Sequence, residues 1–360
     1  ALEAVDRSLK DIVGVHRPFD GKVVLLCGDF RQILPIVPKG TDAQVVQQCI
    51  KKSPLWRLFR VLRLKTNMRV RTAPTVQNAN DLQQFADFLL CIGEGRHSTY
   101  PGMHASVAKL PHDMVLPNSS SIDADVRKLV KRVYPNLRWH YRKAEYFTDR
   151  AISPKNSDVT AINNSVLEQL PGQVQEYLSV DTLVNPEEQE ALQLPPKFLH
   201  SINVSGIPVH CLRLKKNTSV LLLRNLNTER GLCNGTRLQI IDMKPHCIHA
   251  RILTGKRWGD DVLLPRIFCD SNDVNLPFQI RRKQFPVQVC FAMTINKAQG
   301  QSLHHFGLYL PSDVFAHGQL YVALSRVTSR KNVAVLIVNP DYDLGGVTVR
   351  NIVYHEVIDK

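Results

Sequence analysis

Residues 289–326 decide the fold class, and they read VCFAMTINKAQGQSLHHFGLYLPSDVFAHGQLYVALSR. The stretch opens with an apolar run typical of a buried strand, followed by a polar turn that contains Gly300 and starts a helix. FGLYL at 306–310 predicts a second strand, and GQLYVALSR predicts a helix with an apolar face and one arginine, Arg326. This order is typical of α/β folds that handle nucleotides. We interpret the stretch as a sheet edge that senses phosphate.

The composition indicates a globular, basic protein. The chain has 360 residues, 44% of them hydrophobic, which suffices for a sizeable core in two or three domains. Its formal net charge is +14, and the basic residues gather at 69–71, 127–132, 215–216 and 281–283. Such clusters favour a polyanionic partner, although a merely solvated basic surface is the alternative.

The eight cysteines include no C-x-x-C pair, and Cys27, Cys211 and Cys290 lie in apolar, strand-like runs. Buried reduced thiols in a reducing, intracellular compartment are therefore expected. The alternative is a zinc site built from Cys233, Cys247 and His249. No apolar run approaches the ~20 residues of a membrane span, so no membrane association is expected.

An apolar run at 22–27 predicts a buried strand that ends in GDFRQILP. Polar side chains at the carboxyl end of a strand are candidates for ligand binding in open α/β sheets. Gln32 suits a γ-phosphate sensor, because a neutral amide can donate to phosphate and orient water. Asp29 is a second candidate; its alternatives are a Mg²⁺ ligand and an aspartate that caps its own backbone.

Strands and helices alternate through the first half of the chain. Helices are expected over 1–13, 76–91, 122–133 and 159–170, and strands over 59–64 and 147–154. The strand at 59–64 leads to Arg69, and residues 98–122 are expected to form an exposed excursion. The alternation favours a parallel sheet.

From Tyr177 to Phe285 the pattern changes to short β-rich runs separated by tight turns such as Asn234-Gly235. This spacing predicts a small antiparallel β-barrel inserted at 200–284. After it, residues 287–291 are expected to return to the parallel sheet, and 333–339 to form its last strand. The predicted domains are 1–60, then 61–199 with 285–345, the insertion 200–284, and a peripheral tail 346–360.

Five motifs in this order, GDFRQILPIV, LKTNMRV, RAISPKN, TINKAQGQSL and YVALSRV, resemble superfamily-one DNA helicases of the petite-integration-frequency (Pif) type, in the version found with Helitron-like transposons. The resemblance covers nearly the whole chain. It implies RecA-like domains, ATP with Mg²⁺ as cofactors, single-stranded DNA as partner, and 5′-to-3′ unwinding in DNA repair and recombination. A nuclear location and a monomeric state are also expected.

The resemblance assigns roles to individual residues. Asp29 and Gln32 belong to the motif that couples the γ-phosphate to DNA, with Arg31 beside them at the DNA. Arg69 and Arg326 resemble the two arginines that reach the triphosphate, where a guanidinium offers forked donors that lysine lacks. The turn that touches nucleotide and DNA is matched by Thr294, Asn296, Lys297, Gln299 and Gly300.

Basic residues of the predicted insertion form a further candidate group. Arg224 lies at a strand end, and Arg281 and Arg282 lie where the insertion rejoins the rest of the chain. They could line a groove for the DNA backbone, and solvated surface charge is the alternative. A solvated lysine is likewise the alternative for Lys297.

One family feature is missing from the sequence. No G-x-x-x-x-G-K-[ST] loop occurs, since Gly21-Lys22 is followed by valine and Gly255-Lys256 by arginine, and no Asp-Glu pair precedes GDFRQ. We expect an N-terminally truncated first RecA-like domain without the principal Mg²⁺ ligands, so that this chain alone binds ATP weakly and hydrolyses it negligibly. A non-catalytic nucleic-acid-binding module derived from a transposon helicase, or a protein-interaction scaffold, remains open.

Overall fold

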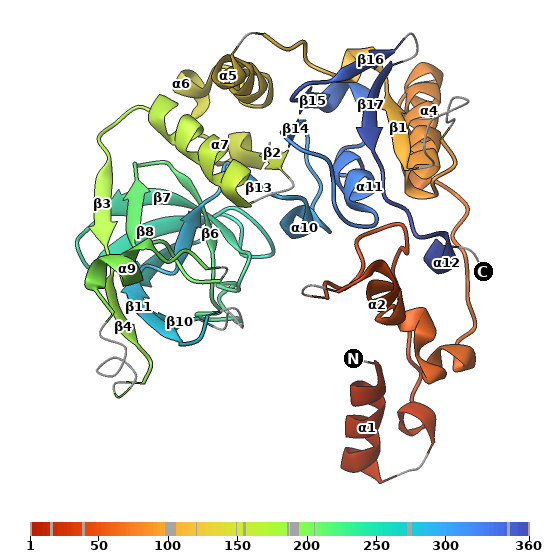
Figure 1. Cartoon of the computed structure of the whole chain (residues 1–360), viewed down its shortest axis with the longest axis horizontal. Coiled ribbons are helices and arrows are strands. Elements are labelled where there is room, and N and C mark those ends of the chain that lie inside the picture. The colour runs from red at the N-terminus through yellow and green to blue at the C-terminus, as the bar shows by residue number, and fades with distance from the viewer. Residues whose placement is uncertain are drawn as a thin grey trace. The chain divides into compact units, whose positions relative to one another are not determined.

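The computed structural model describes residues 2–14, 17–37, 40–97, 106–119, 121–148, 150–153, 156–185, 187, 194–204, 206–271, 276–343 and 346–358. The protein is a mixed α/β chain (Figure 1). It divides into two compact units. Unit 1 comprises Ala1–Asp125 and Thr294–Lys360, and unit 2 comprises Val126–Met293. Each unit is described by itself.

Unit 1 contains the two ends of the chain. Its helices are α1 (Leu2–Val13), α2 (Asp42–Gln47), α3 (Met68–Arg71), α4 (Val76–Gly93), α10 (Ile295–Ala298), α11 (Gln319–Leu324) and α12 (His355–Ile358), with short 3₁₀ helices at Pro18–Gly21, Ile50–Lys52, Pro54–Leu58, His112–Met114 and Arg330–Asn332. Its strands are β1 (Val107–Leu110), β14 (Phe306–Leu310), β15 (Val333–Ile337), β16 (Asp341–Asp343) and β17 (Gly346–Arg350).

The predicted strand–helix–strand unit is confirmed at β14, α11 and β15. The two strands pair in parallel from Phe306 opposite Val333 to Leu310 opposite Ile337, and every residue of both is buried. Continuous apolar runs are expected of parallel strands because both faces of such a sheet are covered. The helix predicted at 76–91 is also confirmed as α4, which Thr75 caps by accepting the Asn78 N–H.

Two expected strands of the first 64 residues do not form. Residues 22–27 and 59–64 belong to no strand, and Val23 and Leu64 are about fully exposed (101% and 99%). A strand exists only by pairing its N–H and C=O groups with a neighbour. Among the described residues, no strand pairs with either run, so their β-propensity alone does not make them strands.

The expected excursion at 98–122 and the expected peripheral tail are both partly wrong. Residues 98–105 and 120 lie outside the described part, but β1 at 107–110 pairs antiparallel with β17, and β17 pairs with β16. Leu110 and Val347 are completely buried in this three-stranded sheet. Val347 and Val349 of the tail therefore belong to the core of unit 1, because β17 pairs with β1, a strand that is far away in the sequence.

Unit 2 carries most of the β-structure. Its helices are α5 (Ile122–Val133, which begins in unit 1), α6 (Leu137–His140), α7 (Asn156–Gln169) and α9 (Pro196–Ser201), with a 3₁₀ helix at Ala144–Thr148. Its strands are β2 (Arg150–Ser153), β3 (Gln175–Leu178), β4 (Val180–Leu183), β5 (Cys211–Leu214), β6 (Ser219–Leu222), β7 (Arg237–Met243), β8 (Cys247–Ile252), β9 (Asp261–Pro265), β10 (Ile267–Asp270), β11 (Ile280–Gln284), β12 (Val287–Val289) and β13 (Ala292–Thr294).

The predicted closed barrel is not found among the described residues. Strands β12-β6-β7-β8-β9 form one five-stranded antiparallel sheet, β10-β11-β4 a three-stranded sheet, and β3-β5 a pair. A barrel needs its first and last strands to pair, and β12 and β9 are instead the two edges. The strand expected to rejoin the parallel sheet, β12, pairs antiparallel with β6. The spacing of the β-rich runs predicted strands and turns, but not which strands pair with each other.

None of the eight cysteines, all of which lie in the described part of the chain, takes part in a disulfide. Cys290 is buried as predicted, whereas Cys27 and Cys211 are exposed, contrary to the expectation. Cys233, Cys247 and His249 do not converge within the described residues, so the alternative zinc site is not formed. No helix of the described ranges is long and apolar enough to cross a membrane.

Candidate functional site

The segment 28–32 lies against α11 in unit 1. The Tyr321 hydroxyl donates to Asp29 Oδ2 at 2.8 Å, and Asp29 Oδ1 accepts the backbone N–H of Arg31 at 3.1 Å. Burial, and then the charge of Asp29, raises the pKa of Tyr321 to about 12, so the hydroxyl remains a donor near neutral pH. Both carboxylate oxygens accept protein donors, which favours Asp29 as an anchor that caps its own turn over Asp29 as a metal ligand.

A buried histidine joins the same segment to the C-terminal residues. His317 Nε2 lies 2.9 Å from the Phe30 carbonyl oxygen, and the Tyr354 N–H donates to His317 Nδ1 at 2.8 Å. A carbonyl can only accept and a backbone N–H can only donate, so the neutral ring with its proton on Nε2 satisfies both partners. Burial lowers the pKa of His317, which keeps this tautomer neutral.

We expect unit 1 to lose stability as pH falls below the usual histidine pKa of 6.5. The unfolded chain takes up the proton in that range, whereas the folded His317 resists it because its pKa is lowered, so folding is fully favoured above 6.5 and is opposed increasingly down to the folded pKa. The measurement is urea unfolding between pH 5.5 and 7.5. His97 and His210 shift in the same direction, so the His317→Gln variant, which keeps a donor and an acceptor, isolates the effect: its curve should be flatter. An unchanged slope would contradict the assignment.

Gly318 brings the start of α11 onto the backbone of this segment. Its φ is +72°, and an added Cβ would lie 2.3 Å from the Arg31 carbonyl oxygen and 2.8 Å from the Gln32 carbonyl carbon. Only glycine combines the left-handed conformation with such an approach. The sequence at 317–319 therefore fixes where Arg31 and Gln32 lie.

The turn at 294–301 contacts the same segment through a pair of amides. Thr294 Oγ1 accepts the Lys297 N–H at 3.3 Å and caps α10, and the Gln299 side-chain amide donates to Gln32 Oε1 at 3.0 Å. The predicted residues Gln32 and Gln299 are thus brought together from positions that are far apart in the sequence. Lys297, Gln299 and Gly300 are exposed.

Gln319 ties this turn to the loop before α11. It is completely buried, its Oε1 accepts the N–H groups of Phe315 and Ala316 at 2.9 and 3.2 Å, and its Nε2 donates to Asn296 Oδ1 at 3.4 Å. A buried amide that satisfies its partners fixes a single arrangement of the elements around it. The buried Gln319 amide therefore fixes the position of the Asn296 side chain.

Arg326 is buried, with 8% of its surface exposed. Its guanidinium donates to the carbonyl oxygens of Val322 (2.7 Å), Gln301 (3.1 Å) and Ala298 (3.4 Å), and to Ser325 Oγ at 2.8 Å. In this arrangement Arg326 closes the turn 298–301 onto the end of α11. A contact with a triphosphate would require some of these bonds to be released.

Arg31 and Arg69 are the two other arginines of unit 1 that the sequence predicted as site residues. Arg31 is partly exposed, and its Nε lies 3.1 Å from Glu94 Oε1 at the end of α4. Arg69 lies in α3, but its side chain lies outside the described part of the structure.

The three predicted arginines of unit 2 are engaged by protein groups. Arg224 donates to the Asp270 carbonyl oxygen at 2.5 Å, and Arg281 forms two bonds with the Asp270 carboxylate, at 2.8 and 2.7 Å. Arg282 is completely buried and bonded to Asp181. The expectation that Arg282 lines a DNA groove is therefore wrong, because no part of its side chain reaches solvent. Sequence alternation on β11 could have indicated this, since Ile280, Arg282 and Gln284 share one face.

Sequence reasoning missed three residues that build the site: His317, Gln319 and Tyr321. Each is a polar side chain within an otherwise apolar stretch, and a buried polar group needs a defined partner. That pattern was visible at 317–321, but the partners, in segment 28–32 and at Asn296 and Tyr354, were not.

Two family models match the chain. A PIF1-like helicase model matches residues 1–101, and a model of the DNA helicase Pif1 2B domain matches residues 197–243, inside the β-rich part of unit 2. Together they include Asp29, Arg31, Gln32, Arg69 and Arg224.

Curated relatives extend the similarity over most of the chain. The ATP-dependent DNA helicase PIF1 of Homo sapiens is 27% identical over 351 residues, and that of Xenopus laevis 25% identical over 350. Each alignment covers 94% of this chain and 44% of the relative. The chain thus spans less than half the length of these relatives.

Solved structures share the fold. The Pif1 helicase of Candida albicans aligns with a TM-score of 0.60 at 22% identity, covering 99% of this chain and 72% of that one. The Bacteroides Pif1 helicase in complex with ADP-AlF3 and ssDNA aligns with a TM-score of 0.62 at 18% identity, covering 99% and 70%. These likenesses confirm the α/β, RecA-like fold class expected from the sequence. In sequence and in fold, the chain is similar to PIF1-like helicases.

Proposed function

We propose that these residues are part of an ATP-dependent DNA helicase that couples ATP hydrolysis to 5′-to-3′ translocation on single-stranded DNA. The observation that carries the proposal is the amide pair Gln32–Gln299, which joins segment 28–32 to the exposed turn 294–301. The match of residues 1–101 to a PIF1-like helicase model supports it, as do the names of the relatives and the ADP-AlF3 and ssDNA bound by the Bacteroides protein.

The residues present fit one side of a nucleotide. Lys297 and the Gln299 amide are exposed donors. No atom beyond the neighbouring residues lies within 4 Å of the position that a Cβ on Gly300 would take. Anionic oxygens can therefore approach the turn closely. Asp29 is occupied by Tyr321 and Arg31, so the Mg²⁺ ligands are expected from other residues. When bound, ATP with Mg²⁺ supplies the phosphoryl group, and Gln32 orients the attacking water. Once some of its bonds to carbonyl oxygens are released, Arg326 would donate to the negative charge that develops on the transferred phosphoryl group.

The amide pair gives the mechanism a direct link between two ligands. Gln32 stands at the end of a segment held by Tyr321, His317 and Gly318, whereas Gln299 stands on the turn that the resemblance places at the DNA. A shift of either amide breaks the 3.0 Å bond. Occupancy of one ligand is thereby communicated to the other as a change in bonding, which is what coupled turnover requires.

Replacing Gln32 by alanine is expected to lower DNA-stimulated ATP hydrolysis at least about tenfold in the intact helicase, because an oriented donor to the reacting phosphate and water is lost. DNA affinity should change little, since Gln32 is not proposed to touch DNA. Phosphate release and fluorescence anisotropy with single-stranded DNA are the measurements. Gln83→Ala, on an exposed face of α4 where its amide bonds Asp87, is the matched control. Equal rates in both variants would contradict the role.

A polypeptide of only these 360 residues is expected to bind single-stranded DNA but to hydrolyse ATP negligibly, because the phosphate-cradling loop with its lysine is not among them. Steady-state phosphate release with and without DNA tests this, and turnover at ordinary helicase rates would refute it. DNA affinity that does not weaken with added salt would instead favour a protein-interaction scaffold. We also propose a nuclear location, which imaging of a fluorescent fusion tests.

A further inference from the structure

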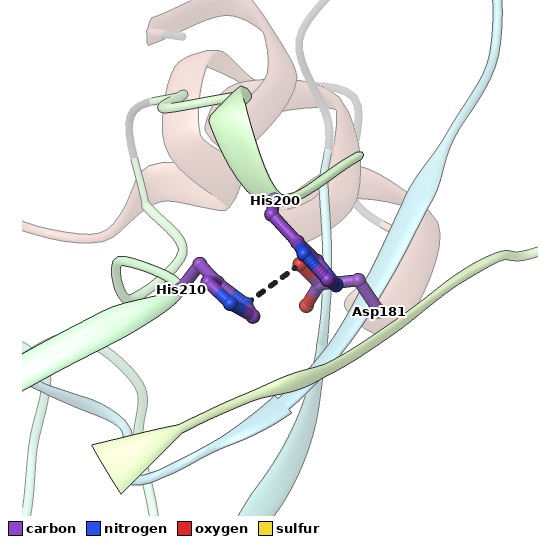
Figure 2. A group of neighbouring side chains, drawn as sticks. All are labelled: Asp181, His200 and His210. Atoms are coloured by element: carbon purple, nitrogen blue, oxygen red, sulfur yellow. Dashed lines mark ion pairs between the residues drawn. The ribbon is translucent and has the colours of Figure 1, made fainter. Parts of the chain in front are cut away.

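Three side chains of types that commonly bind metals meet in unit 2, whereas the site described above consists of residues of unit 1. Asp181 comes from β4, His200 from the last turn of α9, and His210 from the residue before β5. One ligand atom of each lies within 4.8 Å of the other two. Figure 2 shows the two imidazole rings side by side with the Asp181 carboxylate next to them. Segments distant in the sequence thus present two nitrogens and an oxygen to one point.

Arg282 and Ser179 hold the Asp181 carboxylate in place. Arg282 Nε and Nη2 each bond one oxygen of Asp181 at 2.8 Å, and the Ser179 hydroxyl donates to Oδ1 at 2.6 Å. The Asp181 side chain has no exposed surface. Carboxylates that bind metals are typically fixed by such surrounding hydrogen bonds.

The histidines are placed more loosely. Their rings stack with centroids 3.8 Å apart and 11° between the planes. His210 Nδ1 lies 2.8 Å from Ser179 Oγ and 3.4 Å from Asp181 Oδ2. Among the described residues, His200 makes no hydrogen bond, so its ring nitrogens remain available as ligands.

We propose that Asp181, His200 and His210 bind a divalent transition-metal ion of the zinc type. Two imidazoles and a carboxylate are a donor set that suits zinc, with water completing four-coordination. Ligand atoms around zinc lie about 3.3 Å apart, as follows from bonds of about 2.0–2.1 Å. The stacked rings must therefore turn and close on binding, and the terminal torsion of histidine is broad enough to permit this.

The ion would have a structural role and stabilise the connection between β4 and β5. The connection between β4 and β5 contains only α9 as a described helix, and it packs on the apolar cluster of Leu183, Leu199, Ile207, Phe278 and Ile280. A metal bound to β4, α9 and the start of β5 would fix this connection to the sheet. Arg282 already offsets the Asp181 charge, so two neutral nitrogens must supply most of the affinity. This inference does not rest on the proposed helicase function.

The test uses the 360-residue chain, stripped of metal by a chelator and then titrated with Zn²⁺ alone. We expect one equivalent to bind and to raise the Tm by about 3 °C or more at saturation, because the ion binds the folded state preferentially. Co²⁺ in place of Zn²⁺ should give the visible absorption of a four-coordinate nitrogen–oxygen site. Both responses should be lost in His200→Ala, which removes a ligand but no hydrogen bond, and in His210→Ala.

His246→Ala is the matched control, because His246 is an exposed histidine of the same unit and should leave both responses intact. The eight free cysteines can also take up zinc, so the comparison between variants carries the conclusion. Should His210→Ala fail to fold, His200→Ala decides. The same stoichiometry and Tm shift in wild type and His200→Ala, or no shift in wild type, would overturn the proposal.

Discussion

Replacing Arg282 by methionine is expected to destabilise unit 2 by about 3–5 kcal/mol, because it leaves a buried carboxylate without its counter-charge. Arg282 and Asp181 have no exposed side-chain surface. The guanidinium also donates to the carbonyl oxygens of Leu199, Pro208 and Ile202, at 3.0, 2.9 and 3.3 Å. One side chain therefore satisfies a charge and three backbone acceptors, and thermal unfolding should show a Tm lower by roughly 10 °C.

The neighbouring residue supplies the control for this experiment. Arg281 lies on the same strand and forms an equally short two-bond pair with Asp270, but its side chain is 40% exposed. Water and salt screen such a pair, so Arg281→Met should cost only about 0–1 kcal/mol. If both variants unfold alike, burial is not what makes the Arg282 pair important.

Replacing Gly318 by alanine is expected to destabilise unit 1 by about 2–5 kcal/mol. A side chain at its φ of +72° costs about 1–2 kcal/mol. The Cβ would also lie 2.3 Å from the Arg31 carbonyl oxygen, so backbone must move, as in an overpacked core, at a further ~1–3 kcal/mol. The movement would displace Gln32 from Gln299. In the intact helicase, DNA-stimulated ATP hydrolysis should fall along with stability.

Gly300→Ala separates the two contributions to this loss. Gly300 has nearly the same backbone conformation, with φ of +80°, but nothing lies within 4 Å of the added Cβ. This variant should therefore show the conformational cost alone, about 1–2 kcal/mol. Urea unfolding of the two variants gives the difference. Equal losses would contradict the view that close approach at Gly318 positions segment 28–32.

Much of the local structure was predictable from the sequence. The apolar runs at 306–310 and 333–337 and the periodic helix over α4 form near their expected positions, and the β-rich region between Tyr177 and Phe285 does contain short strands, because each pattern encodes its own periodicity. Two β-prone runs, 22–27 and 59–64, form no strand because β-structure also requires a partner edge. The same dependence on partners explains why a barrel was expected, whereas the described residues form separate open sheets.

The candidate site was likewise predictable only in part. Gln32, Thr294, Asn296 and Gln299 were singled out through the resemblance of their motifs to those of Pif-type helicases, and the structure brings them to one region of unit 1. Arg282 was assigned to a DNA groove because it belongs to a run of basic residues where the predicted insertion rejoins the rest of the chain. Its burial depends on Asp181, a hundred residues earlier, and on three carbonyl groups whose position no local pattern encodes.

The sequence by itself determined the fold class, the similarity to Pif-type helicases and the order of the motifs, because these depend on periodicity and on residues that lie close together in the chain. Only the tertiary structure decided that His317, Gly318 and Tyr321 hold segment 28–32, that Arg326 is caged by carbonyl groups, and that Asp181, His200 and His210 converge. The physical reason is that a hydrogen bond, an ion pair or a metal site requires two or more groups to meet within a few ångströms, and folding, not sequence proximity, brings them there.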